Sequence, residues 1–376
     1  MQLSVIILNY NVKYFLDACI QSVQKAISAY DAEIIVADNA STDGSKTYFS
    51  GKYPDVKFLW FNSNDGFAKG NNLAVQQARG KYLLILNPDT LLAENAFDEL
   101  FSFIKDKENF GIVGGKMIDG TAAFLPESKR GIPTPIVAFS KLTKLYKLLN
   151  FSPFNNYYQA KLKVNESGKT PILTGAFMFV KKSVYDEVGG FDERYFMFGE
   201  DIDLSYTIQK SGRDNYYLPT AKIIHFKGES TQKDEKYIRR FVDTTFQFQE
   251  KHFRTFLPQK FLMRSFFKLW MKMRVKKAQN KQIDLSNKKI CFVGNAQNFN
   301  KIKTQFSNAE LLEIMPDSIA DSILIFDTSA YGFKEIIDKM ESLHNKQNHF
   351  RFYFPESQII LGSDAKDKLG EVLICK

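Results

Sequence analysis

The chain has 376 residues, of which 44% are hydrophobic and 25% are charged, a composition that agrees with a soluble globular protein of two domains with an appendage. No apolar run approaches the roughly 18 residues of a membrane-spanning helix, so the sequence excludes a span of that kind. The formal net charge of +9 is concentrated, because residues 251–277 contain nine Lys or Arg and no Asp or Glu.

The first residues and the cysteines predict a cytosolic location. The apolar stretch Leu3–Leu8 follows the initial methionine without a basic leader or a small-residue cleavage site, so we expect no secretion signal. Cys19, Cys291 and Cys375 lie far apart and form no metal-type pair, which is typical of a protein of the reducing cytosol.

The first ninety residues alternate between short apolar runs and polar, helix-compatible stretches. The apolar runs are SVIIL from Ser4, AEIIVAD from Ala32 and YLLILN from Tyr82, and helices are expected at residues 16–29 and 69–79. Short apolar strands separated by helices predict a parallel sheet with helices on both faces.

Each of these three strands ends in a polar cluster. The clusters are Asn9–Asn11, Asp38–Ser41 and Asn87–Asp89. Ligands of open α/β sheets bind beyond the carboxyl ends of strands, so the clusters are expected to line one crevice. The same residue types also make ordinary turns and helix caps, but three such clusters in register favour a site.

Two further stretches are candidates for contacts with a ligand. In residues 64–72 the glycines Gly66 and Gly70 let the backbone approach a ligand closely, although the stretch also fits a plain helix-entry loop. Residues 128–165 contain seven Lys or Arg and no acid, and read as an insertion on the sheet. Arg130 at its start either meets donor or acceptor phosphates or is solvated.

The stretch from Gly199 to His225 contains the clearest chemical signal. Glu200 and Asp201 form an acidic pair that opens a predicted helix, and His225 closes a predicted strand. Acidic residues also favour a helix N-terminus through its dipole, and a lone histidine at a strand end is more often structural. Together with Asn87–Asp89, however, the pair and the histidine indicate sugar transfer from a nucleotide.

That reaction needs two kinds of group. A divalent cation held by hard ligands stabilises the leaving diphosphate, and Asp89 and His225 are the expected ligands, with Asn87 placed to bind ribose. A carboxylate must deprotonate the acceptor hydroxyl, and we assign that role to Asp201. Glu200 then orients the loop or binds the acceptor.

Asp203 and the last third of the chain are expected to stand outside the chemistry. Asp203 faces away from Asp201 on a helix and is expected only to cap or pair. Residues 261–277 are expected to form a basic amphipathic helix suited to an anionic membrane surface, or else one with a solvated Lys stripe. From Lys288 a second α/β pattern begins, to which we assign no catalysis and by default structural support, with docking or regulation as alternatives.

Six motifs occur in a specific order and spacing. They are VIILNYN at 5–11, ADNASTDGS at 37–45, NDGFAKGNN at 64–72, NPDT at 87–90, TGAFMFVKK at 174–182 and GGFDERYFMFGEDIDL at 189–204. By these motifs the stretch from Ser4 to Ser230 resembles family-2 glycosyltransferases of the GT-A fold, and among them the bacterial rhamnosyltransferase-like branch. The implied organisation is a GT-A domain at residues 1–235, a basic helical segment at 236–285 and a small α/β domain at 286–376.

The resemblance implies a role for each motif. The nucleotide is expected to meet Asn9, Asp38, Asn39, Asp65, Gly66, Asn87 and Asp89. The resemblance further implies that Asp89 and His225 bind Mn²⁺ or Mg²⁺ and that Asp201 is the base of an inverting single displacement. Arg130 and Gly175 are expected to contact the acceptor or a phosphate. One departure is that Asn87-Pro88-Asp89 stands where many relatives have Asp-x-Asp, which removes a carboxylate from the metal site.

The partners implied are a dTDP- or UDP-sugar donor, with dTDP-rhamnose foremost, and a glycan or lipid-linked acceptor at the inner face of the plasma membrane. A sugar-phosphate nucleotidyltransferase is an alternative, but it would carry a Gly-rich basic loop directly after the first strand, where this chain has Asn9–Asn11. A nucleic-acid binder would place its basic stripe on the sheet, whereas the charge here lies outside it, so we expect no nucleic acid partner.

Overall fold

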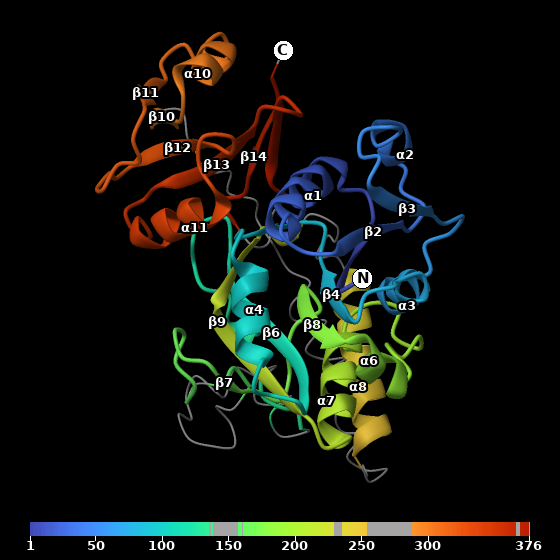
Figure 1. Ribbon diagram of the computed structural model, residues 1–376. Coiled ribbons are helices and arrows are strands. Elements are labelled where there is room, and N and C mark those ends of the chain that lie inside the picture. Colours follow the sequence, from blue (N-terminus) through green and yellow to red (C-terminus); the bar gives the residue numbers. More distant parts are fainter. Residues whose placement is uncertain are drawn as a thin grey trace.

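Figure 1 shows a computed structural model of the chain. The structure describes residues 1–134, 137, 157–159, 161–228, 235–253, 288–365 and 369–375. In these residues the chain forms a nine-stranded sheet up to residue 225 and a six-stranded sheet after residue 288.

The first sheet has the strand order β3-β2-β1-β4-β8-β6-β9-β5, with β7 paired to β9. Its strands are β1 (Leu3–Asn9), β2 (Ala32–Asp38), β3 (Val56–Trp60), β4 (Tyr82–Leu86), β5 (Thr90–Leu92), β6 (Phe110–Ile118), β7 (Gly168–Lys169), β8 (Phe177–Lys181) and β9 (Asp214–His225). The strands β3, β2, β1 and β4 are parallel, β8 is antiparallel to β4 and β6, and β6 and β9 are again parallel.

Helices cover both faces of this sheet. They are α1 (Lys13–Ile27), α2 (Ser45–Tyr48), α3 (Phe67–Val75), α4 (Ala96–Ile104), α6 (Lys182–Glu187), α7 (Glu200–Lys210) and α8 (Glu235–His252), with a 3₁₀ turn η1 (Pro126–Ser128). Alternate residues of β1 point to opposite faces: Leu3, Val5 and Ile7 pack with α1 and α4, and Ile6 and Leu8 with α3 and α7. This arrangement confirms the predicted fold class.

The parallel strands bring their polar ends to one edge. Asn9 at the end of β1 pairs with Asp38 at the end of β2, and Leu86 of β4 pairs with Ile7. His225 at the end of β9 pairs with Thr90 of β5. The predicted start of a helix at Glu200 and the predicted end of a strand at His225 are both confirmed.

The helix predicted at residues 69–79 ends early, because α3 stops at Val75. The amides of Gln77 and Ala78 bond three residues back, which tightens the chain into a turn. At Gly80, a Cβ atom would lie 2.4 Å from the backbone nitrogen of Ser4. The close approach of this turn to β1 therefore sets the end of the helix.

The second sheet has the order β11-β10-β12-β13-β14-β15, with the first four strands parallel and the last two antiparallel. Its elements are β10 (Lys289–Val293), α10 (Ala296–Ile302), β11 (Glu310–Leu312), β12 (Ser322–Asp327), α11 (Phe333–Ser342), β13 (His349–Phe354), β14 (Ile359–Gly362) and β15 (Glu371–Ile374). The predicted second α/β pattern is confirmed.

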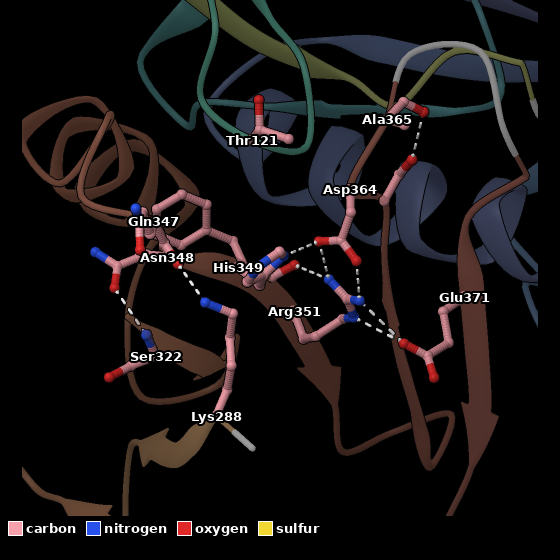
Figure 2. Close-up of polar contacts among 12 residues, drawn as sticks. Thr121, Lys288, Ser322, Gln347, Asn348, His349, Arg351, Asp364, Ala365 and Glu371 are labelled. Carbon is pink, nitrogen blue, oxygen red and sulfur yellow. Dashed lines mark hydrogen bonds and ion pairs between the residues drawn. The ribbon is translucent and has the colours of Figure 1, made fainter. Parts of the chain in front are cut away.

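A buried arginine ties the antiparallel strands of this sheet together (Figure 2). The Arg351 guanidinium donates to both carboxylate oxygens of Asp364 at 3.0 and 2.6 Å and to Glu371 at 3.0 and 3.1 Å. His349 lies 2.7 Å from Asp364 through Nδ1. Only 4% of Arg351 is exposed, so this network replaces its lost hydration.

The two sheets pack against each other through α1, α11 and the ends of β5 and β9 (Figure 1). The ring of Phe226, directly after β9, lies 5.2 Å from that of Phe15 and 5.7 Å from that of Phe352. The carboxylate of Glu94 accepts the amides of Phe333 and Lys334 at the start of α11. Because one hydrophobic cluster spans both sheets, the predicted boundaries at residues 235 and 285 stay a prediction, and the basic helix at 261–277 lies outside the described residues.

Candidate active site

The polar ends of β1 and β2 form one hydrogen-bonded cluster. Asn9 Nδ2 donates to Asp38 at 2.7 Å and lies 3.2 Å from the hydroxyls of Ser41 and Ser45. The backbone amide of Asn39 bonds to the carbonyl of Asn9 at 2.9 Å. Within the described part of the chain, the buried Oδ1 atoms of Asn9 and Asn39 have no partner, so two acceptors remain for a ligand.

The Gly66 loop closes over this cluster from the side. Gly66 has φ 87°, and a Cβ atom there would lie 2.3 Å from the carbonyl oxygen of Phe196. Asn39 Nδ2 donates to the carbonyl of Gly66 at 3.0 Å. Asp65 points outward and forms an ion pair with Lys69 at 2.8 Å. The glycine therefore permits the close approach of two loops, while its predicted approach to a ligand stays a prediction.

Asp89 and His225 lie side by side, as the sequence predicted for a metal pair. Asp89 Oδ1 is 3.3 Å from His225 Nε2, and Asn87 Nδ2 is 3.4 Å from the same nitrogen. Two backbone contacts fix this geometry. Thr90 pairs with His225 between β5 and β9, and the amide of Phe226 donates to the carbonyl of Asp89.

The donor set at this pair fits a cation that is shared with a substrate. Over the described residues, Asn87 Oδ1 and His225 Nδ1 are buried without a partner. No group of three His, Cys, Asp or Glu side chains suited to a metal occurs in the parts of the chain listed above as described. One carboxylate and one imidazole suffice for Mn²⁺ or Mg²⁺ when phosphate oxygens and water complete the shell.

The acidic pair begins α7 beneath the same edge. Asp201 Oδ2 accepts the guanidinium of Arg130 at 2.6 Å and the backbone amide of Gly175 at 3.1 Å. Glu200 is buried, and its Oε2 has no partner among the residues that the structure describes. Burial first, and then the charge of Asp201, raise the pKa of Glu200 to about 8. The two carboxyl groups therefore have different environments, a pattern found where acid and base roles are divided.

Asp203 pairs with groups of α8. Lys251 Nζ lies 2.7 Å from Asp203 Oδ2, and His252 Nε2 lies 2.7 Å from Asp203 Oδ1. This agrees with the prediction that Asp203 only caps or pairs. Because α8 lies beside α7 (Figure 1), these contacts hold α8 against the helix that begins with the acidic pair.

A short backbone path connects the Asp89 side with the Asp201 side. The amide of Asn87 donates to the carbonyl of Ala176 at 3.1 Å, and the neighbouring Gly175 donates to Asp201. The strands β4 and β8 are antiparallel neighbours, so the end of one meets the start of the other. The structure therefore brings both predicted groups to the same edge of the first sheet.

Four residues at this edge were not predicted from the sequence. Glu127 in η1 forms an ion pair with Lys227, which comes two residues after His225. Phe196 is one of the exposed large hydrophobic residues, and the Arg240 guanidinium lies 4.6 Å from the centre of its ring. A charged side chain two positions beyond a predicted ligand was the available signal for Lys227, whereas no local pattern marks Glu127.

A comparison with protein families identifies the domain that contains this edge. Residues 4–189 match the model described as glycosyl transferase family 2. The chain contains a family 2 glycosyltransferase domain. This glycosyltransferase is an enzyme whose first sheet has the mixed, mostly parallel and helix-covered arrangement that the sequence predicted.

Its curated relatives include rhamnosyltransferases. It is 29% identical over 215 residues to the N-acetylglucosaminyl-diphospho-decaprenol L-rhamnosyltransferase of Mycobacterium tuberculosis, covering 54% of this chain and 68% of that protein. It is 27% identical over 192 residues to the rhamnosyltransferase WbbL of Escherichia coli, covering 49% of this chain and 69% of that protein. These relatives support the rhamnosyltransferase-like branch.

Solved glycosyltransferase structures are also similar. The mannosyltransferase PcManGT from Pyrobaculum calidifontis, in complex with GDP-Man and Mn²⁺, has 17% identity and a TM-score of 0.46 over 73% of this chain and 70% of that one. GalNAc-T7 with UDP, GalNAc and Mn²⁺ has 15% identity and a TM-score of 0.46 over 73% of this chain and 56% of that one.

Of the helices in the described ranges, none has the length and apolarity needed to span a bilayer.

Proposed function

We propose that this glycosyltransferase moves rhamnose or another hexose from a dTDP- or UDP-sugar to a glycan or lipid-linked acceptor in cell-surface polysaccharide synthesis. The observation that carries the proposal is the single edge that holds both the Asp89–His225 pair and Asp201. The family supports the reaction class, and the names of the relatives support the sugar and the lipid-linked acceptor.

The nucleotide is held at the ends of β1, β2 and β4. The unpartnered oxygens of Asn9, Asn39 and Asn87 accept hydrogen bonds from the base and the ribose hydroxyls. Asp38 orients Asn9 through their 2.7 Å bond, and Asp65 and Gly66 border the nucleotide from the neighbouring loop. These residues bind and orient the donor.

Asp89 and His225 would hold Mn²⁺ or Mg²⁺, with Asn87 in the position of a second carboxylate. When bound, this cation stabilises the negative charge of the leaving diphosphate. The burial of both side chains keeps them in place for this role, with Asp89 4% and His225 7% exposed.

Asp201 acts as the base in a single displacement. Its carboxylate accepts the proton of the acceptor hydroxyl as that oxygen attacks the anomeric carbon, and the carbon–oxygen bond to the diphosphate breaks on the opposite face, so the configuration inverts. Arg130 and the amide of Gly175 hold the carboxylate in position through Oδ2. Glu200, whose raised pKa favours the protonated form, donates a hydrogen bond to the acceptor.

The acceptor approaches from the side of α8. Phe196 and Arg240 provide an exposed ring and a cation there, a pair suited to a sugar next to a phosphate. The basic residues 251–277, most of which lie outside the described ranges, would bring the protein to the anionic inner face of the plasma membrane as a peripheral protein.

The test is to incubate the protein with a panel of nucleotide sugars and Mn²⁺ and to measure release of the nucleoside diphosphate. Asp201→Asn is expected to abolish release, whereas Asp203→Asn, a buried aspartate two residues further along α7, is expected to retain it in the folded protein. Release of pyrophosphate would instead indicate a nucleotidyltransferase, and tight RNA retention without turnover a nucleic-acid binder. Thermal stabilisation by one donor of the panel would identify the nucleotide.

A further inference from the structure

An ion pair at the end of β9 has no role among the groups assigned so far. Lys227 Nζ contacts Glu127 Oε1, and the two side chains are 28% and 21% exposed. Both side chains are therefore mostly buried, and a part of each faces solvent. Lys227 follows His225, a residue of the proposed metal pair, by two positions in the sequence.

Glu127 reaches this position because η1 folds back on β6. The amide of Leu125 bonds to the carbonyl of Met117 at 2.9 Å, and the amide of Met117 donates to the Ser128 hydroxyl at 3.1 Å. The next residue of β6, Ile118, pairs with Ile224, the neighbour of His225 in β9. Two segments about a hundred residues apart in the sequence thus place a carboxylate and an ammonium at the same edge.

The backbone at Lys227 is in a conformation that L residues rarely adopt. Its φ is 62°, and that of the following Gly228 is 80°, so the chain turns sharply on leaving β9. A lysine in the left-handed region is unfavourable, and such residues occur preferentially at functional sites. The turn directs Lys227 back toward Glu127.

Glu127 contacts the ammonium of Lys227 and lies close in the sequence to Arg130. Burial raises its pKa, but the charge of Lys227 and the hydrogen bond from its ammonium outweigh this effect, so the net shift is downward. Glu127 precedes Arg130, the partner of Asp201, by three residues. The pair therefore joins the segment that carries Arg130 to the segment that carries His225, and both segments reach the edge where the proposed donor binds.

We propose that Lys227 is a further substrate-binding residue. Its ammonium gives up the contact with Glu127 and binds the diphosphate of the donor, and it stabilises this diphosphate as the leaving group. This inference rests on the proposed function. As the bond from the anomeric carbon breaks, its electron pair passes to the diphosphate oxygen, and the ammonium donates a hydrogen bond to that oxygen without transfer of a proton. Lys227 adds positive charge at a site where Asn87 stands in place of a second carboxylate.

The experiment measures dissociation constants by calorimetry for UDP, dTDP and the corresponding nucleoside monophosphates, in EDTA and again with Mn²⁺. The variants are Lys227→Gln and Glu127→Gln. Lys222→Gln is the matched control. Lys222 lies near the end of β9, forms ion pairs with Asp338 and Glu341, and has a side chain that is 26% exposed. None of these measurements requires turnover.

We expect Lys227→Gln to weaken nucleoside diphosphate binding about tenfold or more and monophosphate binding less than twofold, in EDTA as well as with Mn²⁺. Glu127→Gln is expected to leave diphosphate binding unchanged or to strengthen it, because Lys227 is then free. Lys222→Gln is expected to change neither.

Equal weakening of both nucleotide classes by Lys227→Gln, or similar losses in Lys227→Gln and Glu127→Gln, would show that the pair is only structural and would overturn this inference. Unchanged diphosphate binding in Lys227→Gln would also overturn it, while the proposed function would stand. If the wild-type protein bound no nucleoside diphosphate, the proposed function itself would fail.

Discussion

Two buried polar clusters of this protein differ in how completely their atoms are paired. In the second sheet, Arg351, Asp364, His349 and Glu371 form a network in which each buried nitrogen or oxygen has a partner (Figure 2). At the edge of the first sheet, buried atoms stay unpaired within the described structure. They are Oδ1 of Asn9, Asn39 and Asn87, Nδ1 of His225, Nε of Arg130 and Oε2 of Glu200.

The difference separates polar groups that hold the fold from polar groups prepared for a ligand. A buried polar atom without a partner costs about 1–3 kcal/mol, so a protein retains several together only where something else is gained. Replacements in the paired cluster should therefore reduce stability, whereas replacements in the unpaired cluster should reduce binding or turnover. Each prediction below tests one side of this contrast.

The largest effect is expected for Asp201→Asn. The amide keeps the shape of the side chain but cannot take the acceptor proton, so kcat should fall by about 10³-fold, within the usual range for general base catalysis. Steady-state release of nucleoside diphosphate measures this loss. Asp203→Asn is the control, because Asp203 pairs with Lys251 and His252. Equal losses of kcat in the two variants would remove Asp201 from the role of base.

Next in size is the effect of Asp89→Asn and His225→Ala on the metal dependence. Each variant removes one of two proposed ligands, so the Mn²⁺ concentration for half-maximal activity should rise about 100-fold. Asp119→Asn, a buried aspartate that accepts the amides of Thr121 and Ala123, is the control and should leave the Mn²⁺ titration unchanged. A Mn²⁺ titration that is identical in wild type and both variants would contradict the proposed pair.

Arg351→Met is expected to reduce stability without reducing turnover. The change leaves Asp364 and Glu371 without their guanidinium, and breaking a buried ion pair costs about 3 kcal/mol. Urea unfolding measures the loss, and kcat per folded molecule should stay within twofold. A large fall in kcat at full folding would show that the second sheet takes part in the chemistry.

Per pH unit, a smaller effect is expected in the pH dependence of stability. Glu200 has a folded pKa of about 8, above its ordinary value of 4.5, so the folded protein binds more protons than the unfolded chain between these pH values. Stability should therefore fall as the pH rises through this window, by at most about 1.4 kcal/mol per pH unit. Glu200→Gln should flatten the profile. Parallel profiles for the two proteins would contradict the raised pKa.

The sequence predicted local features of the fold and the site well. Strands that end in polar clusters, the helix that starts at Glu200 and the strand that ends at His225 all depend on short-range patterns, and the structure contains them. The strand β6 was not predicted, because its glycines and a lysine interrupt the apolar run although all nine residues are buried.

Contacts between distant segments were beyond prediction from spacing. Arg130 and Asp201 are 71 residues apart in the sequence. Glu127 and Lys227 are 100 residues apart. Only the pairing of β6 with β9 and the fold of η1 bring such side chains together. Arg130 was assigned to a phosphate or to solvent from its sequence context. In the structure its guanidinium is buried against Asp201, while the phosphate role stays a prediction.

The most direct test is a crystal structure of the protein with Mn²⁺ and dTDP or UDP. The account predicts the ion between Asp89, His225 and the diphosphate, with the nucleoside against Asn9 and Asp38 and with Asp201 facing the same space from the other side. A nucleotide bound in a hollow lined by Asp89 but closed off from Asp201 would contradict it.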